Sequence, residues 1–209
     1  MAKGIFIVID GGEGAGKGTQ IARLKEAYPE ALFTREPGGS EYAEEIRNIM
    51  LKSPLAKGAS AETQFGLVWA ARADHIRRKV MPALESGRHV ISDRFDSSTF
   101  AYQLHGQGGL HLRDLFFAVR KQFLGDCMPD LYLFLEVDPE ESIRRTKQRA
   151  TLFGESNHFD EREVTFHNRV REGYREFARL FPGNCRTVDA NRSIEEVWKS
   201  IEDIIKPLL

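Results

Sequence analysis

A glycine-rich segment near the start of the chain restricts the fold more strongly than any other feature of the sequence. The apolar run Ile5–Ile9 precedes it, and such a run is typical of a buried central strand in a parallel sheet. The segment reads Gly-Gly-Glu-Gly-Ala-Gly-Lys-Gly-Thr over residues 11–19, and a helical pattern runs from about Lys17 to Ala27. A strand, a glycine-rich turn and a helix in this order predict an α/β fold with the turn at the carboxyl end of the strand.

The rest of the chain continues this alternation of short apolar runs and longer helical patterns, with no linker or internal repeat. We predict one α/β domain over residues 1–209, in three layers, with a five-stranded parallel sheet, helices on both faces and a short lid at about 145–162. Strands are expected at Ile5–Ile9, Leu32–Thr34, His89–Ser92, Leu131–Val137 and Arg186–Val188. Helices are expected at about 17–27, 41–51, 61–84, 98–103, 112–124 and 161–181, and after Asp138 and Ser193, while 149–159 is expected to be a mobile loop.

Composition and charge narrow the classes of partner. The chain has 30 basic and 31 acidic residues, and this balance argues against a surface built to hold nucleic acid. No apolar run approaches the ~20 residues of a membrane span. Cys127 and Cys185 are not spaced like metal ligands, and two cysteines in a chain of this length are too few for a disulfide framework. This pattern is typical of reduced thiols. We therefore expect a cytoplasmic protein with no nucleic-acid partner and no membrane role.

The glycine-rich segment has the composition of a phosphate-binding loop. Glycines let the backbone curl so that successive N–H groups point inward at phosphate oxygens, and the following helix adds its positive N-terminal end. Lys17 supplies a full positive charge for the β and γ phosphates of a nucleoside triphosphate. The residues expected to bind that nucleotide are Gly11, Gly12, Glu13, Gly14, Ala15, Gly16, Lys17, Gly18 and Thr19.

One position of the loop departs from the usual pattern. Gly18 stands where a serine or threonine would hold Mg²⁺, and the hydroxyl comes one residue later, at Thr19. Thr19 is therefore a candidate metal ligand, either directly or through a water molecule. Asp93, at the carboxyl end of a predicted strand, is the second candidate, because a carboxylate there can position Mg²⁺ or its waters beside the loop.

Three further segments carry residues that a phosphoryl acceptor would need. They are Thr-Arg-Glu-Pro-Gly-Gly-Ser at 34–40, Ala-Ala-Arg-Ala-Asp-His at 70–75, and the stretch 92–103 that begins Ser-Asp-Arg and ends Ala-Tyr-Gln. Together with the loop they closely resemble the bacterial thymidylate kinases, over essentially the whole chain. The resemblance implies the P-loop kinase fold, ATP and Mg²⁺ as cofactors, phosphorylation of dTMP to dTDP for DNA synthesis, and a homodimer.

The resemblance also implies roles for individual residues. A planar guanidinium can grip a phosphate through two hydrogen bonds, and Arg72 and Arg94 are expected to bind the dTMP phosphate while Asp93 organises the metal site. Glu13 is expected to face the sugar 3′-hydroxyl, and Tyr102 to pack against the deoxyribose, where a ribose 2′-hydroxyl would crowd it. Residues expected to contact the base or its surroundings are Ser98, Thr99 and Gln103.

The base site departs from the family pattern at one position. Members usually carry a phenylalanine four residues before the helix arginine, where it stacks on thymine, but this chain has Val68 followed by Trp69. Three alternatives stay open: stacking by Trp69, stacking by Phe65 one turn earlier, or a base held differently. Burial of the thymine methyl group supplies at most ~0.8 kcal/mol, so that burial alone cannot exclude dUMP strongly.

A cluster of basic residues precedes the expected lid: Arg144, Arg145, Lys147 and Arg149. In bacterial members whose phosphate loop lacks an arginine, as this one does, lid arginines stabilise the transferring phosphate, an effect worth ~10³–10⁵-fold. Arg149 is the first candidate for this catalytic role and Arg145 the second. The chain departs from the family pattern at His158, where relatives often have arginine, so alignment alone does not assign the role.

Two alternative functions stay open from the sequence. One is a nucleoside monophosphate kinase of other or broad specificity, because the Gly-Lys-Gly-Thr-Gln loop also resembles adenylate kinase. The other is a non-catalytic nucleotide-binding switch, although a switch needs neither a second anion site nor a basic lid.

Overall fold

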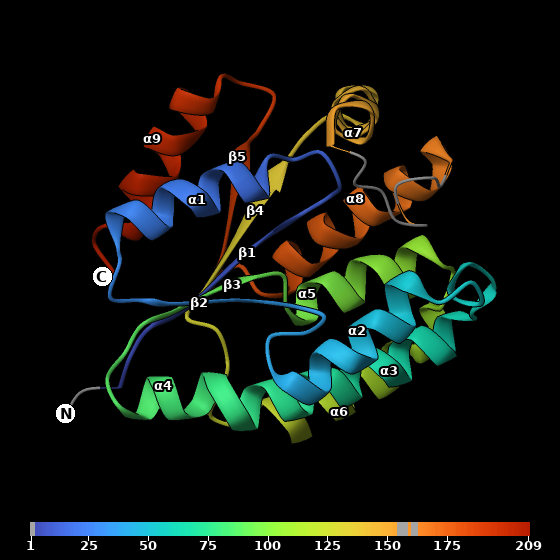
Figure 1. Cartoon of the computed structure of the whole chain (residues 1–209), viewed down its shortest axis with the longest axis horizontal. Helices are drawn as coiled ribbons and strands as arrows, with labels where there is room; N and C mark the ends of the chain where they lie inside the picture. The colour runs from blue at the N-terminus through green and yellow to red at the C-terminus, as the bar shows by residue number, and fades with distance from the viewer. Residues whose placement is uncertain (1–2, 154–158, 160–162) are drawn as a thin grey trace.

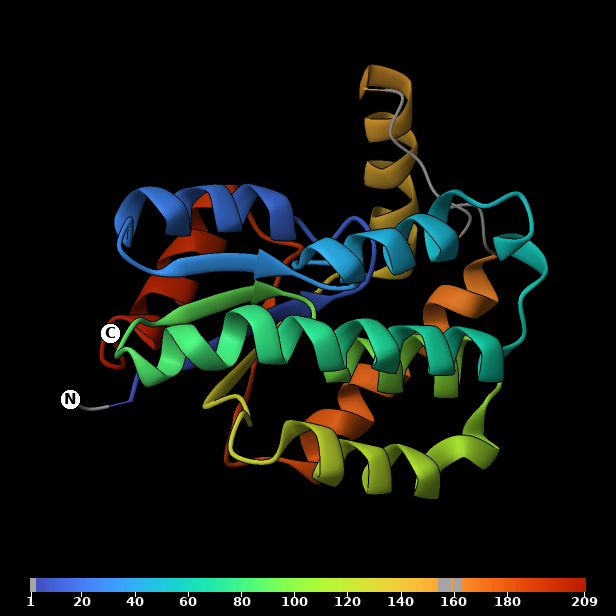
Figure 2. The same cartoon turned by 60° about the horizontal axis from the view of Figure 1, so that its bottom comes forward.

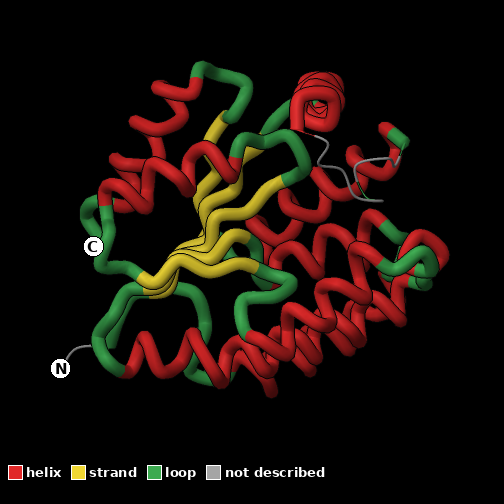
Figure 3. Tube along the Cα trace, viewed as in Figure 1, coloured by secondary structure: helices red, strands yellow, loops and turns green. Residues whose placement is uncertain are grey.

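The computed structural model describes residues 3–153, 159 and 163–209. Its centre is one parallel sheet with the strand order β2-β3-β1-β4-β5. The strands are β1 (Phe6–Gly11), β2 (Leu32–Arg35), β3 (Val90–Asp93), β4 (Leu131–Glu136) and β5 (Cys185–Asp189). The predicted five-stranded parallel sheet is therefore confirmed, and each expected strand is found within two residues of its predicted bounds. Figure 3 shows the strands side by side at the centre of the molecule.

Helices cover both faces of the sheet (Figure 1). One face carries α1 (Lys17–Ala27) and α9 (Ile194–Ile205). The remaining helices are α2 (Glu41–Lys52), α3 (Ala61–His75), α4 (Met81–Glu85), α5 (Asp96–Thr99), α6 (Arg113–Leu124), α7 (Pro139–Phe153) and α8 (Val164–Leu180). Short 3-10 and π-helical segments are η1 (Ala56–Gly58), η2 (Ile76–Val80), η3 (Phe100–Gly106) and η4 (Leu110–Leu112).

Strand β1 shows how the sequence produces the three layers. All six of its residues are buried, and because side chains alternate across a strand, successive residues enter different cores. Phe6 and Val8 join the cluster that includes residues of α3, η3 and α8, whereas Ile7 and Ile9 join the cluster that includes residues of α1 and α9. The run of apolar residues is thus explained by burial on both faces.

The strand order places a change of direction at β1. The chain passes from β1 to β2, returns to β3 between them, and then continues on the other side of β1 with β4 and β5. In sheets of this kind, ligands bind at the carboxyl ends of the strands where the order reverses. Here those ends are Gly11 of β1, Asp93 of β3 and Glu136 of β4.

The segment after β4 differs from the expectation at one end. A loop was expected to start at Arg149, but α7 continues to Phe153, because Arg149, Ala150 and Leu152 are good helix formers and the glycine comes only at 154. Figure 2 shows α7 standing away from the sheet. Most of the rest of the expected lid, including His158, lies outside the described residues. Across the residues that the structure describes, no helix has the length and apolarity to span a membrane.

Candidate active site

The glycine-rich loop joins β1 to α1, as predicted, and two of its glycines are required by their surroundings. Gly11 has φ 142°, and a Cβ there would lie 2.4 Å from the Leu135 carbonyl oxygen of β4. Gly14 has φ 67°, and a Cβ there would lie 2.5 Å from the Ser142 carbonyl oxygen of α7. The loop is therefore held between two neighbouring elements in a backbone conformation that disfavours residues with a side chain.

The start of α1 is prepared for an anion. Gly16 precedes the helix and offers no side-chain cap, and the first turn contains no acidic residue. The N–H groups of that turn and the positive end of the helix dipole are therefore available to phosphate oxygens.

Lys17 lies over the same loop. Its Nζ donates hydrogen bonds to the carbonyl oxygens of Gly11 at 3.0 Å and Gly12 at 2.8 Å, and the residue is only 8% exposed. Burial lowers the pKa of the Lys17 ammonium, and the positive charge of Arg94 lowers it further. A bound phosphate would oppose both effects, because an opposite charge favours the ammonium form.

Arg94 follows β3 in a strained conformation. It is the one non-glycine residue with a positive φ, 68°, in the part of the chain that the structure describes. Its N–H donates to the Ile9 carbonyl at 3.0 Å, and its carbonyl accepts from Ser92 Oγ at 2.7 Å. Such a conformation costs about 1–3 kcal/mol and persists where the surroundings impose it, often at a functional site.

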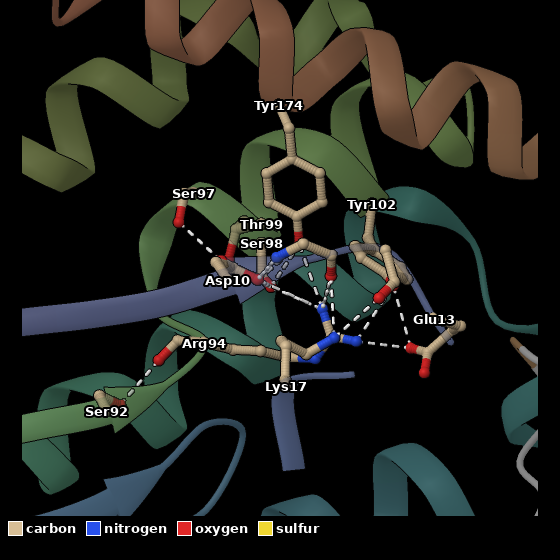
Figure 4. Close-up of polar contacts among 12 residues, drawn as sticks. Asp10, Glu13, Lys17, Ser92, Arg94, Ser97, Ser98, Thr99, Tyr102 and Tyr174 are labelled. Carbon is tan, nitrogen blue, oxygen red and sulfur yellow. Dashed lines mark hydrogen bonds and ion pairs between the residues drawn. The ribbon is translucent and has the colours of Figure 1, made fainter. Parts of the chain in front are cut away.

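The Arg94 guanidinium points back into the phosphate loop (Figure 4). Nη1 donates to the Gly11 carbonyl at 3.0 Å, and Nη2 donates to Glu13 Oε1 at 2.6 Å and to Tyr102 Oη at 3.2 Å. Nη1 also donates to Ser98 Oγ at 3.1 Å. Glu13 was singled out in the loop, and Arg94, Ser98 and Tyr102 in the segment 92–103, and the structure brings the two segments together through these side chains.

Two residues that the sequence did not reveal hold this group in place. Asp10 is fully buried and accepts hydrogen bonds from Ser98 Oγ at 2.9 Å and from Tyr174 Oη of α8 at 2.6 Å. Burial alone would lower the pKa of Arg94, but Tyr102, Glu13, Tyr174 and Asp10 hold it well above its usual value. A polar residue at the end of an apolar strand was the one available sequence signal, and it pointed only to Asp10.

Arg72 lies in an adjacent polar group and does not contact the loop. Its Nε donates to Glu36 Oε2 at 2.7 Å and its Nη2 to Thr99 Oγ1 at 3.0 Å, and the side chain is 1% exposed. The neighbouring hydroxyls Ser98 and Thr99 on α5 thus serve Arg94 and Arg72 respectively. The remaining nitrogen, Nη1, is buried and has no hydrogen-bond partner within the described residues.

Arg47 of α2 is a third cation near this end of the sheet, and the sequence analysis did not identify it. Its Nη1 donates to the Pro37 carbonyl at 2.6 Å. Its pKa is lowered by burial and then by the positive charge of Arg35. Asp93 and Arg94 also act on this pKa, so Arg47 lies within electrostatic range of the end of β3.

The two expected metal ligands occupy different environments. Asp93 Oδ1 is buried and has no hydrogen-bond partner among the residues described, while Thr19 is exposed on the first turn of α1. The described residues contain no group of three or more His, Cys, Asp or Glu side chains that could hold a metal. A free carboxylate oxygen suits Mg²⁺, which commonly completes its coordination with substrate phosphates and water, so these residues fit the ion.

Comparison with known proteins assigns the chain to a family. The family model for thymidylate kinase matches residues 9–201. The chain belongs to the thymidylate kinase family. The thymidylate kinase of Caulobacter vibrioides is 40% identical over 209 residues, covering 98% of this chain and 97% of the relative. The thymidylate kinase of Hahella chejuensis is 39% identical, covering 96% and 95%.

The fold agrees with that of a solved thymidylate kinase. The crystal structure of thymidylate kinase from Ehrlichia chaffeensis is 27% identical in sequence and superposes with a TM-score of 0.74 over 98% of this chain and 99% of that chain. The predicted family, the P-loop kinase fold and the assignment as an enzyme are therefore confirmed.

In this member of the thymidylate kinase family, Trp69, one of the side chains considered for stacking on the base, packs in the apolar core. Trp69 is 3% exposed and its ring contacts Phe65, Phe116 and Phe123, at centroid distances of 6.1, 5.8 and 6.0 Å. Its outer neighbour is the Arg72 guanidinium, 4.4 Å from the ring centroid. Val68 of α3 and Gln103 of η3, which were also expected near the base, are buried as well.

The lid arginines are only partly described. Arg145 donates from Nε to Glu141 Oε1 at 2.6 Å and from Nη1 to the Ala190 carbonyl at 3.0 Å. Arg144 and Arg145 together hold the pKa of Glu141 down at about 2. Arg145 is thus bonded to residues outside the phosphate loop, and the side chain of Arg149 lies outside the described residues.

Proposed function

We propose that this chain transfers the γ-phosphoryl group of ATP to dTMP and releases ADP and dTDP. The observation that carries the proposal is the position of Arg94, whose guanidinium contacts both the phosphate loop at Gly11 and the carboxylate of Glu13. Phosphoryl transfer between two polyanions requires fixed cations where their phosphates meet. Arg94 and Lys17, which both donate to the Gly11 carbonyl oxygen, supply two of these cations.

The donor side is formed by the loop, the start of α1 and Lys17. Backbone N–H groups of residues 11–19 bind the phosphates, and Lys17 exchanges the carbonyl oxygens of Gly11 and Gly12 for the β and γ phosphates. Asp93 and Thr19 would hold Mg²⁺, directly or through water, and the bound ion would supply positive charge to the phosphate oxygens.

The acceptor side is formed by α2, α3, α5 and η3. Arg94 and Arg47 bind the acceptor phosphate, and the free Nη1 of Arg72 donates to the acceptor nucleotide. Glu13 accepts from the 3′-hydroxyl and Tyr102 packs on the deoxyribose. The base lies near Val68, Trp69, Ser98, Thr99 and Gln103. The acceptor phosphate is already ionised at pH 7, so the attack needs no protein nucleophile.

The lid supplies the last cation to the transferring phosphate. We assign this role to Arg149 first and to Arg145 second. Arg145 would have to leave Glu141 and the Ala190 carbonyl in order to reach the phosphate. Closure of the lid would also exclude water and limit hydrolysis of ATP.

We also propose a cytoplasmic homodimer. Two apolar side chains of α6 support the dimer, because Leu115 is 49% exposed and Phe123 is 42% exposed, and a second copy of the chain would cover them. Phe123 contacts Trp69 of α3, so a partner on α6 would pack close to the acceptor side of the site.

A coupled assay of ADP release across a panel of monophosphates tests the proposal. With ATP and Mg²⁺, dTMP is expected to give faster turnover than dUMP, AMP or CMP. Faster turnover of AMP or CMP would reject dTMP as the substrate and favour a kinase of other specificity. Nucleotide binding without multiple turnover on any acceptor would favour a non-catalytic switch.

A further inference from the structure

A chain of buried hydrogen bonds ends on Arg72. His75 Nδ1 lies 2.9 Å from Glu36 Oε1, and Glu36 Oε2 accepts from Arg72 Nε at 2.7 Å. Because a carboxylate only accepts, His75 Nδ1 is the donor in the first of these bonds. The other ring nitrogen, Nε2, lies 2.7 Å from Thr34 Oγ1 of β2. His75 is 0%, Glu36 3% and Arg72 1% exposed.

The backbone of the loop after β2 seals this chain. A Cβ at Gly39 would lie 2.5 Å from His75 Nε2 and 2.7 Å from Thr34 Oγ1, and Gly39 has φ 93°. The loop therefore packs directly against the pair formed by Thr34 and His75. The imidazole is fixed on three sides, by the strand, the loop and Glu36, so it has little freedom to release the carboxylate.

Arg72 makes more polar contacts than a residue that only fills the core would need. Its guanidinium lies over the Trp69 ring at 4.4 Å, and its Nε and Nη2 are fixed by Glu36 and Thr99. Nη1 is left buried without a hydrogen-bond partner in the described part of the chain, a state that is costly unless a ligand supplies the acceptor. The contacts therefore fix the orientation of the guanidinium and keep one donor free.

We propose that His75 is a positioning residue for the acceptor nucleotide: through Glu36 it fixes the Arg72 guanidinium so that Nη1 is presented to the acceptor. This inference rests on one part of the proposed function, namely that Arg72 Nη1 donates to the acceptor nucleotide. His75 itself does not touch the nucleotide. Without its hydrogen bond, Glu36 can rotate, and Arg72 binds the acceptor less well because part of the binding free energy is then used to order it.

The test compares two substitutions of His75 with a neighbour. His75→Leu removes both hydrogen bonds, whereas His75→Asn keeps a donor close to the position of Nδ1. Asp74→Asn is the matched control, because Asp74 accepts from Ser40 of the same loop at 2.6 Å and from Arg78 at 2.7 Å, and neither of these bonds leads to Glu36 or Arg72. Each protein is first checked for a native melting transition. The KM of acceptor and ATP, the kcat, and the calorimetric Kd for the acceptor without ATP are then measured.

In His75→Leu, the acceptor KM and Kd are expected to rise about tenfold, while the ATP KM stays within about twofold. His75→Asn is expected to restore most of the acceptor affinity, and Asp74→Asn to match the wild type. Unchanged acceptor affinity in folded His75→Leu would overturn the proposal. An equal rise of the ATP and acceptor KM would do the same, because it would indicate general loosening of the site.

A milder variant decides the matter if His75→Leu does not fold. Thr34→Val removes only the hydroxyl that bonds Nε2 and is expected to raise the acceptor KM about threefold, with no change for ATP. No change in either KM would overturn the proposal. The wild-type panel separates this test from the proposed function: if another monophosphate is the better acceptor, dTMP is rejected as substrate and the variants are measured with that acceptor.

Discussion

At the scale of single residues, two cations at the mouth of the loop are held in place by the protein itself. Lys17 is bonded to two loop carbonyls, and Arg94 is bonded to Gly11 and Glu13 from a strained backbone position. The orientation of the Arg94 guanidinium is thus largely fixed by folding, so less free energy is needed to order it when substrates bind, whereas Lys17 exchanges its two loop carbonyls for phosphate oxygens.

Lys17→Met tests the donor side. The variant keeps the length of the side chain but loses the charge that faces the β and γ phosphates, so kcat is expected to fall about a hundredfold or more. Lys25→Met on the exposed face of the same helix is the control and should retain activity. Near-normal turnover of Lys17→Met with a native melting curve would contradict the role of Lys17.

Arg94→Ala tests the acceptor side. Removal of the guanidinium is expected to raise the dTMP KM about tenfold or more and to lower kcat, with a smaller effect on the ATP KM. Initial rates with each substrate varied in turn provide the measurement. An unchanged response to dTMP together with weakened ATP binding would show that Arg94 belongs to the donor site and not to the acceptor site.

At the scale of elements, α8 packs very closely against η3. A Cβ at Gly173 of α8 would lie only 2.7 Å from the Ala101 backbone, whereas a Cβ at Gly66 of α3 would meet nothing within 4 Å. Alanine favours helix over glycine by about 1 kcal/mol at either position, so the contact decides the outcome. Since α8 also carries Tyr174, which bonds Asp10, its distance from η3 affects the site.

Gly66→Ala and Gly173→Ala are therefore expected to change the free energy of unfolding in opposite directions. Gly66→Ala should raise the free energy of unfolding by about 0.5–1 kcal/mol, because an exposed helical site gains helix propensity without a clash. Gly173→Ala should lower it by about 1–3 kcal/mol, because the backbone of η3 must move. Urea unfolding measures both, and stabilisation by Gly173→Ala would contradict the packing of α8.

The elements were largely predictable from the sequence, and the contacts between them were not. Apolar runs such as Ile5–Ile9 specify strands locally, and the glycines of the loop specify the turn. The roles of Asp10, Tyr174 and Glu36 depend on which side chains of distant elements meet, and no periodicity encodes that. Within α7 the helix end was placed too early, because good helix formers continue the helix up to Phe153.

At the scale of the whole molecule, two apolar clusters on opposite faces of the sheet contain nearly all of the buried apolar side chains. Both cysteines belong to the cluster that includes α3, η3 and α8. Burial raises the pKa of the Cys127 and Cys185 thiols from 9.0 to about 12. The reduced thiols expected from the sequence are accordingly found buried and free.

These thiols predict a pH dependence of stability. Between about pH 9 and pH 12 the unfolded chain releases thiol protons and the folded chain keeps them, so the free energy of unfolding falls as pH rises. From pH 8 to pH 10 the free energy of unfolding of the wild type should fall by about 2–3 kcal/mol more than that of a double variant with Cys127→Ala and Cys185→Ala, which has neither thiol. Urea unfolding at the two pH values measures this difference, and equal losses in both proteins would contradict the burial of the thiols.

The central claim is that donor and acceptor phosphates meet between Lys17 and Arg94. A molecule that joins adenosine to thymidine through a chain of phosphates tests it directly, because it can bind well only if one protein chain holds both ends in line. Inhibition competitive with both ATP and dTMP, at one molecule per chain and weakened by Lys17→Met and by Arg94→Ala, is the predicted result. Competition with only one of the two substrates would contradict the claim.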